Sequence, residues 1–137
     1  MRKRVYIAGP ISKGDLCHNI NQGTAAFVAL TKAGFAPFCP HWSVYAKPCR
    51  ATSPDARDNR QRVECLGDWK GNDDMSHEDW MGVDLPWVQI SHAVLRLPGE
   101  SVGADLEVKH ANENGIPVFT DTTELIAHFA KAETAPC

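Results

Sequence analysis

Long apolar runs are absent from this chain of 137 residues. No stretch approaches the roughly 18 to 20 apolar residues that a membrane-spanning helix needs. The short apolar run behind the basic residues 1–4 ends at Gly9, too early for a signal peptide. Long basic runs are missing as well, and the formal net charge is -3. We therefore expect no membrane and no nucleic-acid polymer as partner, whereas this charge does not exclude a single nucleotide.

The cysteines lack the spacing of a metal site. Their number is five, which is odd, and no Cys-x-x-Cys pair occurs. Cys39 and His41 stand two residues apart, but a zinc site normally needs two pairs at such spacings. We expect reduced thiols, a cytoplasmic protein and no bound metal.

The common nucleotide-binding motifs are also missing. Residues 9–14 read GPISKG, which is neither the dinucleotide fingerprint nor a Walker loop, so an ordinary dehydrogenase or ATPase is disfavoured. The backbone of this loop can still cradle one phosphate, with Gly9, Ser12, Lys13 and Gly14 as candidate binding residues. A plain turn between a strand and a helix is the alternative interpretation.

Hydrophobic residues make up 43% of the chain and charged residues 23%, which is typical of one globular domain spanning 1–137. Apolar runs and turn residues predict four strands, at 5–8, 35–39, 92–97 and 117–120. Helix signals predict four helices, at 19–33, 76–90, 101–114 and 122–131. This alternation predicts a Rossmann-like, flavodoxin-type α/β fold of three layers with a four- to five-stranded, mostly parallel sheet.

The stretch at about 40–75 shows no sustained period and is rich in proline, glycine and charge. So long an irregular segment in a small domain is usually functional or mobile. We interpret it as an active-site loop, and a mobile surface loop is the alternative.

Ligands of such folds bind beyond the carboxyl ends of the strands. Residues 9–14 and 98–103 both follow strands and should face one crevice. Ser101 and Gly103 begin a helix there, and a helix N-terminus favours a phosphate or a sugar hydroxyl.

Two carboxylates near this crevice are candidate catalytic groups. Glu107 lies in the first turns of the helix after Ser101, and Asp84 lies in the helix before. A pair of carboxylates is the usual equipment for glycosidic bonds. Alternatively, Glu107 only complements its helix dipole, and Asp84 caps a helix that restarts at Pro86.

Aromatic residues supply further candidates. Tyr6 is either a core residue of the first strand or a hydroxyl donor to a carboxylate at the strand end. His41, Trp42 and Tyr45 follow the second strand and form either a stacking wall for a base or a small packing patch. Trp80 and Trp87 are interpreted as packing residues.

Four segments together resemble the nucleoside 2-deoxyribosyltransferase superfamily, including the 2'-deoxynucleoside 5'-phosphate N-hydrolases and an uncharacterised bacterial and phage branch. They are VYIAGP at 5–10, EDWMGVDLPW at 78–87, LRLPGESVGADLE at 95–107, and GIPVF at 115–119. The third segment is specific, and the resemblance spans roughly residues 4–120 without the 46–75 loop.

The resemblance implies a role for each matching residue. Glu107 matches the glutamate that attacks the sugar C1' and forms a glycosyl-enzyme intermediate. Tyr6 matches the tyrosine that orients this glutamate, and Asp84 matches the aspartate that delivers a proton to the departing base. Ser101 and the loop with Ser12 and Lys13 match the residues that hold the 5'-phosphate. No organic cofactor or metal is needed, and family members usually form homodimers or larger homo-oligomers.

One departure is that Ser91-His92 stands where many relatives carry an aspartate. We expect cleavage of the N-glycosidic bond of a 2'-deoxynucleoside or its 5'-monophosphate, with water or a second base as acceptor. Ser101 and Lys13 favour nucleotide hydrolysis. The alternatives are a non-catalytic nucleotide-binding or sensor domain, and a vestigial crevice beside a partner-binding loop.

Overall fold

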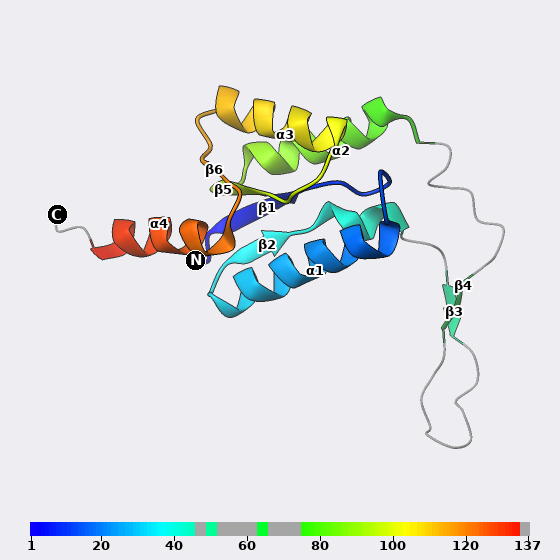
Figure 1. Ribbon diagram of the computed structural model, residues 1–137, viewed down its shortest axis with the longest axis horizontal. Helices are drawn as coiled ribbons and strands as arrows, with labels where there is room; N and C mark the ends of the chain where they lie inside the picture. Colours follow the sequence, from blue (N-terminus) through cyan, green and yellow to red (C-terminus); the bar gives the residue numbers. More distant parts are fainter. Residues whose placement is uncertain (46–48, 52–62, 66–74, 135–137) are drawn as a thin grey trace, which may run out of the picture.

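A four-stranded, all-parallel sheet forms the centre of the computed structural model, which describes residues 1–45, 49–51, 63–65 and 75–134 (Figure 1). The strand order is β2-β1-β5-β6. The bounds are β1 Arg4–Ala8, β2 Ala36–Phe38, β5 Ala93–Arg96 and β6 Val118–Phe119. All four fall inside the predicted strands or within one residue of them.

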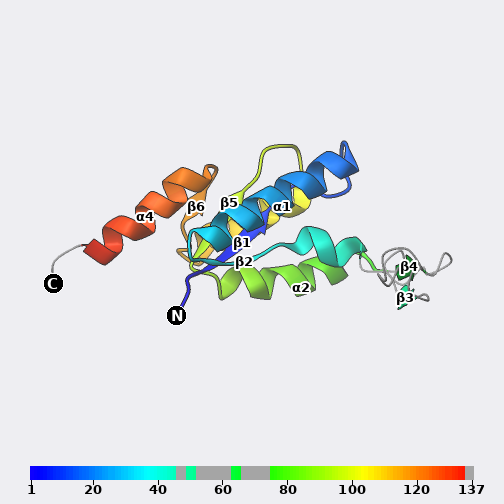
Figure 2. The same cartoon turned by 90° about the horizontal axis from the view of Figure 1, so that it is seen from below.

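Four helices cover the two faces of this sheet. Helices α2 (His77–Gln89) and α3 (Val102–Glu113) lie together on one face, and α1 (Leu16–Lys32) and α4 (Thr122–Thr134) lie on the other (Figures 1 and 2). The protein is therefore the three-layer Rossmann-like fold that the sequence predicts.

The two apolar cores follow from the alternation of side chains along β1. Val5 and Ile7 join the core against α1 and α4, whereas Tyr6 and Ala8 join the core against α2 and α3. Successive residues of a strand point to opposite faces, so a strand covered on both sides is apolar throughout. Tyr6 thereby reaches the layer that holds both candidate carboxylates.

Side chains at the helix starts explain where the helices begin. The Asp15 side chain accepts a hydrogen bond from the backbone N–H of His18 at 2.7 Å, so α1 begins at residue 16, three residues before the predicted start. Ser76 and Asp79 form the predicted capping box of α2. Helix α2 then continues through Pro86 to Gln89 as one helix.

The region after β2 is more ordered than predicted. Strand β2 is an edge strand, as Pro37 indicates, because proline cannot donate a ladder hydrogen bond. A short 3-10 helix, η1, follows at Pro40–Tyr45, and β3 (Cys49–Ala51) pairs antiparallel with β4 (Val63–Cys65). The expectation of irregular chain is wrong for these segments. The active-site role expected of the 40–75 loop falls mainly on 46–48, 52–62 and 66–74, which lie outside the described residues.

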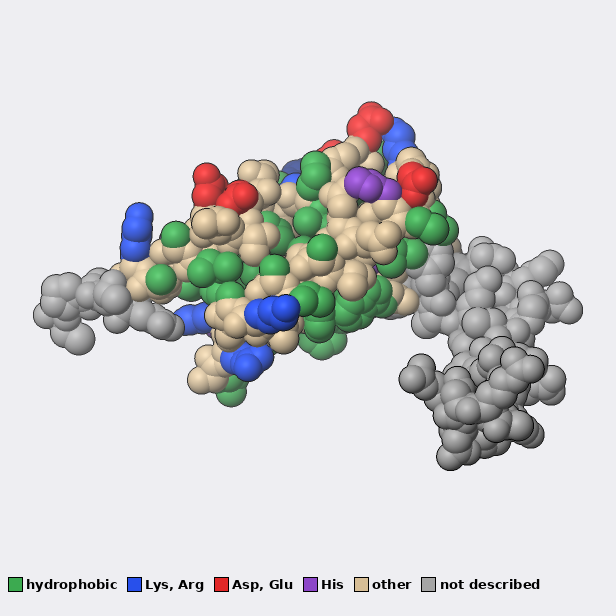
Figure 3. All heavy atoms as spheres, turned by 60° about the horizontal axis from the view of Figure 1, so that its bottom comes forward, with side chains coloured by type: hydrophobic (Ala, Val, Ile, Leu, Met, Phe, Trp, Pro, Cys, Tyr) green, Lys and Arg blue, Asp and Glu red, His purple; other side chains and the backbone are tan. Residues whose placement is uncertain are grey.

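Figure 3 shows acidic, basic and apolar side chains interspersed on one face of the molecule. Helix α4 extends to Thr134, three residues beyond its predicted end. Within the described part of the chain, no helix has the length and apolar character to cross a membrane.

Candidate functional site

The loops after β1 and β5 meet at the point where the strand order reverses. These strands are neighbours in the sheet, and their following connections leave toward opposite faces. A Cβ atom added at Gly99, which has φ +111°, would lie 2.9 Å from Pro10 Cγ. Lys13 Nζ lies 2.7 Å from Glu100 Oε2 and links the same two loops. The predicted common crevice is confirmed.

A cavity of about 460 Å³ opens beside these loops. Three segments form it: the loop after β1, the first half of α2, and the start of α3. Its lining residues are Gly9, Ile11, Ser12, Lys13, His77, Trp80, Met81, Asp84, Ser101, Val102, Gly103, Ala104 and Glu107. The structure thus brings together most of the candidate site residues.

A buried hydrogen bond joins β1 to α3 at this cavity. Tyr6 Oη donates to Glu107 Oε1 at 2.8 Å, and the exposed fractions of the two residues are 0% and 4%. Tyr6 is therefore both a core residue and a hydroxyl donor. Glu107 lies in the second turn of α3, behind Asp105 in the first turn. Because it points into the protein, complementing the helix dipole does not account for its position.

Burial strongly perturbs the acid–base behaviour of the site. Loss of hydration raises the pKa of Glu107 to about 8, although the Tyr6 hydrogen bond and Arg96 lower it. Burial also raises the pKa of Asp84 to about 6. The charge of Asp84 contributes to the rise at Glu107, so the carboxyls titrate as a pair that holds one proton near neutral pH. The pKa of Tyr6 is raised by burial and by both carboxylates, so its hydroxyl stays a donor.

Asp84 reaches the cavity from the middle of α2 and is 6% exposed. The alternative that it caps a restarted helix is wrong, because α2 is continuous from residue 77 to 89. A carboxyl group buried in a helix interior without a capping role costs solvation energy, which indicates a use other than stability.

Side chains beneath the loop after β1 hold its backbone in place, and their role was not identified from the sequence. The buried Asn19 side chain donates to the backbone oxygens of Ile11 at 3.0 Å and Lys13 at 2.8 Å. A Cβ atom at Gly9 would lie 2.9 Å from Leu97 Cβ, so only glycine fits there without a shift. The loop backbone is thus fixed, and an asparagine shortly after a glycine-rich turn was the available signal.

Ser101 is the N-cap of α3, and its Oγ accepts from Ala104 N at 3.2 Å. The hydroxyl hydrogen remains available to donate into the cavity, which Ser101 also lines. Arg96 anchors the adjoining loop by donating to the Gly99 carbonyl oxygen and to Asp105, each at 2.9 Å.

Three candidate binding residues do not line this cavity. His41 is fully buried beside Gly9 and Gly23, where its ring packs beneath the loop after β1. Trp42 packs edge-on against Phe27 and donates to Thr24 Oγ1 at 3.2 Å. The packing-patch interpretation describes both residues.

Gly14 is exposed, with φ +86°, and lines a neighbouring depression beside Glu100. His92 accepts a hydrogen bond at Nδ1 from Arg4 N at 3.0 Å, at the amino end of β5. His92 is not among the described residues that line the cavity, so it supplies no group to the carboxyl pair.

Three residues of α2 were missed as lining residues. His77, Trp80 and Met81 form the wall beside Asp84. Residues spaced by three and four on a helix share a face, so His77 and Trp80 lie on the face that carries Asp84. This spacing was the signal available in the sequence.

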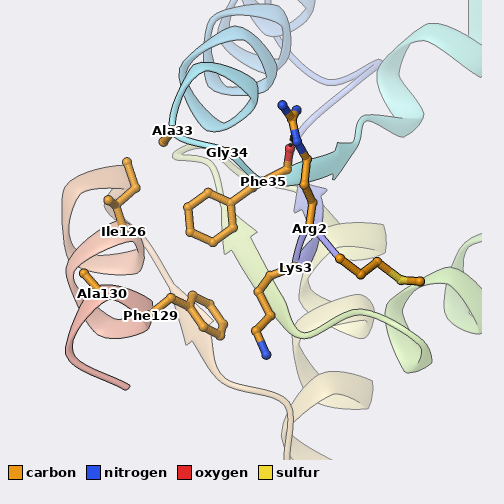
Figure 4. A pocket seen from close by; sticks show the side chains of 9 residues that line it. Arg2, Lys3, Ala33, Gly34, Phe35, Ile126, Phe129 and Ala130 are labelled. Atoms are coloured by element: carbon orange, nitrogen blue, oxygen red, sulfur yellow. Dashed lines mark hydrogen bonds between the residues drawn. The ribbon is translucent and has the colours of Figure 1, made fainter. Parts of the chain in front are cut away.

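A second cavity, of about 440 Å³, lies at the opposite end of the sheet (Figure 4). The rings of Phe35 and Phe129 pack edge-on there with centroids 5.6 Å apart, and Arg2 and Lys3 stand at the side. None of the described residues that line it carries a carboxylate. Its lining therefore offers no acid–base pair.

Within the described ranges, no three histidine, cysteine or acidic side chains are grouped as metal ligands. No family model matches the chain, and neither a curated protein nor a solved structure matches it.

Proposed function

We propose that the protein cleaves the N-glycosidic bond of a 2'-deoxynucleoside or its 5'-monophosphate, with Glu107 as nucleophile. The observation that carries this proposal is the Tyr6–Glu107 hydrogen bond of 2.8 Å at the buried end of a cavity that Asp84 also lines. The resemblance to the nucleoside 2-deoxyribosyltransferase superfamily adds support from the sequence.

The proposed first step uses the single proton that the carboxyl pair holds. The reactive state has a Glu107 carboxylate and a protonated Asp84. Because burial raises the pKa of Glu107 above that of Asp84, this is the less populated arrangement of the proton, and the hydrogen bond from Tyr6 lowers the cost of the charged Glu107. A Glu107 oxygen bonds to C1' while the C1'–N bond breaks. The electron pair of the broken C1'–N bond leaves with the base. Asp84 gives its proton to that base. The product is a free base and a glycosyl ester on Glu107.

The second step releases the sugar from Glu107. The oxygen of water, or a nitrogen of the incoming base, attacks C1'. Asp84, now charged, accepts the proton that this water or base loses. The ester bond to Glu107 breaks, and the original carboxylate returns. Only carboxyl groups and a hydroxyl take part, so this chemistry requires neither a metal nor an organic cofactor.

The 5' end of the substrate is assigned to the loop after β1 and the start of α3. Lys13 offers a cation, and Ser12 and Ser101 offer hydroxyl donors from two walls of the same cavity. Lys13 is already paired with Glu100, so a phosphate must compete with that carboxylate. We also propose a homo-oligomer, on the basis of the family resemblance alone. Analytical ultracentrifugation measures the oligomeric state.

The direct test is incubation with deoxynucleosides and their 5'-monophosphates, with and without a second free base, followed by chromatography of the products. We expect release of the base, and Glu107→Gln should reduce the rate by about 10³-fold or more. Glu113→Gln is the matched control, because Glu113 is an exposed glutamate of the same helix. Full turnover by Glu107→Ala would rule out the covalent route, and intact-protein mass spectrometry looks for the glycosyl adduct.

Nucleotide binding without cleavage is a second candidate, and one observation favours it. Burial raises the pKa of Glu107 to about 8, which keeps this side chain largely neutral at pH 7. A neutral glutamate binds a hydroxyl but does not attack C1'. This candidate predicts bound, uncleaved ligand even at pH 9 and little effect of Glu107→Gln on affinity.

A further inference from the structure

The three tryptophans in the described part of the chain differ in their aromatic partners. Trp42 packs edge-on against Phe27 with centroids 4.5 Å apart, and Trp87 stacks on Phe38 at 4.9 Å with an interplanar angle of 12°. No aromatic ring within the described ranges packs against Trp80. Trp80 is thus the one of these three whose ring faces lack such a partner.

Trp80 is half-buried and lines the cavity that holds the carboxyl pair. It precedes Asp84 by four residues on α2, so both side chains project from the same face of the helix. Apolar side chains from the other two walls, Ile11 and Ala104, also line the cavity. The cavity therefore combines a large aromatic surface with a carboxyl group one helical turn further along α2.

We propose that Trp80 is the platform on which the base of the substrate stacks, with the edge of that base directed toward Asp84. This inference rests on the proposed function and names the part of the site that selects a planar heteroaromatic group. Indole rings bind flat heteroaromatic rings by offset stacking and apolar contact, irrespective of the hydrogen-bonding pattern of the base. Stacking on Trp80 therefore sets affinity for bases as a class, and Asp84 acts on the ring atoms at the edge.

The competing interpretation is that Trp80 only closes the cavity as a packing residue. In that case its removal opens the cavity and weakens every ligand equally, whether or not the ligand carries a base. The two interpretations therefore differ in how they treat a sugar phosphate without a base.

The test measures binding separately from cleavage, in a Glu107→Gln background. Isothermal titration calorimetry determines the affinity of 2'-deoxyadenosine 5'-monophosphate, thymidine 5'-monophosphate and 2-deoxyribose 5-phosphate. The variants are Trp80→Leu, which removes the aromatic face, and Trp80→Phe, which keeps a smaller one. Trp87→Phe is the matched control, because Trp87 belongs to the same helix but does not line the cavity.

We expect Trp80→Leu to weaken both nucleotides by about ten-fold or more, Trp80→Phe to weaken them less, and Trp87→Phe to change neither. Affinity for 2-deoxyribose 5-phosphate should stay the same in all variants. Equal weakening of all three ligands, or unchanged nucleotide affinity in a folded Trp80→Leu protein, would overturn the platform assignment. If Trp80→Leu fails to fold, Trp80→Phe alone decides by the same comparison.

The outcome separates this inference from the proposed function. Nucleotide binding that depends on Trp80, without any cleavage by the wild-type protein, supports the platform and refutes the glycosidase. Cleavage that is insensitive to Trp80 does the reverse. Absence of nucleotide binding and of cleavage refutes both.

Discussion

Replacing Glu107 by glutamine should make the protein more stable at alkaline pH than the wild type. The folded-state pKa of Glu107 is raised from 4.5 to about 8, mainly because burial removes its hydration. A carboxyl group with a raised pKa contributes stability below its unfolded pKa and loses it as pH rises toward the folded value. The wild type therefore loses stability between about pH 4.5 and pH 8, and the neutral glutamine does not.

The size of this effect follows from the same shift. Each pKa unit corresponds to about 1.4 kcal/mol, so the whole window from 4.5 to about 8 amounts to about 5 kcal/mol at most. For a domain of this length, that difference is on the order of 10 °C in Tm. The glutamine keeps an oxygen that accepts the Tyr6 hydrogen bond, so its other costs are the same at all pH values.

Thermal denaturation followed by circular dichroism at pH 4.5 and pH 9 measures this difference. The quantity of interest is the Tm of Glu107→Gln minus that of the wild type, which should increase by several degrees or more from the lower to the higher pH. Glu113→Gln, at an exposed position on α3, should show almost no change with pH. An equal Tm difference at both pH values would refute the assignment of a raised pKa to Glu107.

Three further substitutions test other parts of the site. Tyr6→Phe removes a hydrogen bond to a charged group, so kcat at pH 7 should fall by about 10- to 100-fold, and the acidic limb of the pH–rate profile should move to higher pH; an unchanged profile contradicts the orienting role. Asp84→Asn should slow cleavage by about 10²- to 10⁴-fold for ordinary bases, and much less for a substrate whose leaving group needs no proton; equal losses argue against proton transfer by Asp84. Gly9→Ala places a Cβ atom 2.9 Å from a leucine Cβ and should cost about 1–3 kcal/mol in urea unfolding, whereas Gly82→Ala, with nothing within 4 Å, should not destabilise.

Sequence periodicity was sufficient to predict the three layers and the parallel sheet. Strands covered on both faces read as short apolar runs, and the glycines after the helices end them, as Gly34 and Gly115 do with positive φ values. The predicted start of α1 was three residues late. The N-cap is Asp15, whereas the apolar helical pattern used for the prediction begins only later. Capping depends on one side chain, whereas periodicity needs several residues.

The candidate site was predictable where it depended on strand ends, and not where it depended on helix rotation. Topology alone places the loops after β1 and β5 together, which brings Ser101 near Lys13. His41 follows a strand end as well, but its side chain turned inward beneath Gly9. Trp80 was interpreted as a packing residue because the sequence does not show whether a neighbouring side chain covers its indole ring.

The proline within α2 has a mechanical consequence for the turn that carries Asp84. Pro86 has no N–H to donate to the carbonyl oxygen of Gly82, so one backbone hydrogen bond is missing in the turn that carries Asp84. The capping box at Ser76 fixes the start of the helix, and the buried Val88 fixes its far end. The missing hydrogen bond makes this turn of α2 easier to bend than the turns on either side, so the curvature of the helix can change at Asp84 while its two ends stay in place.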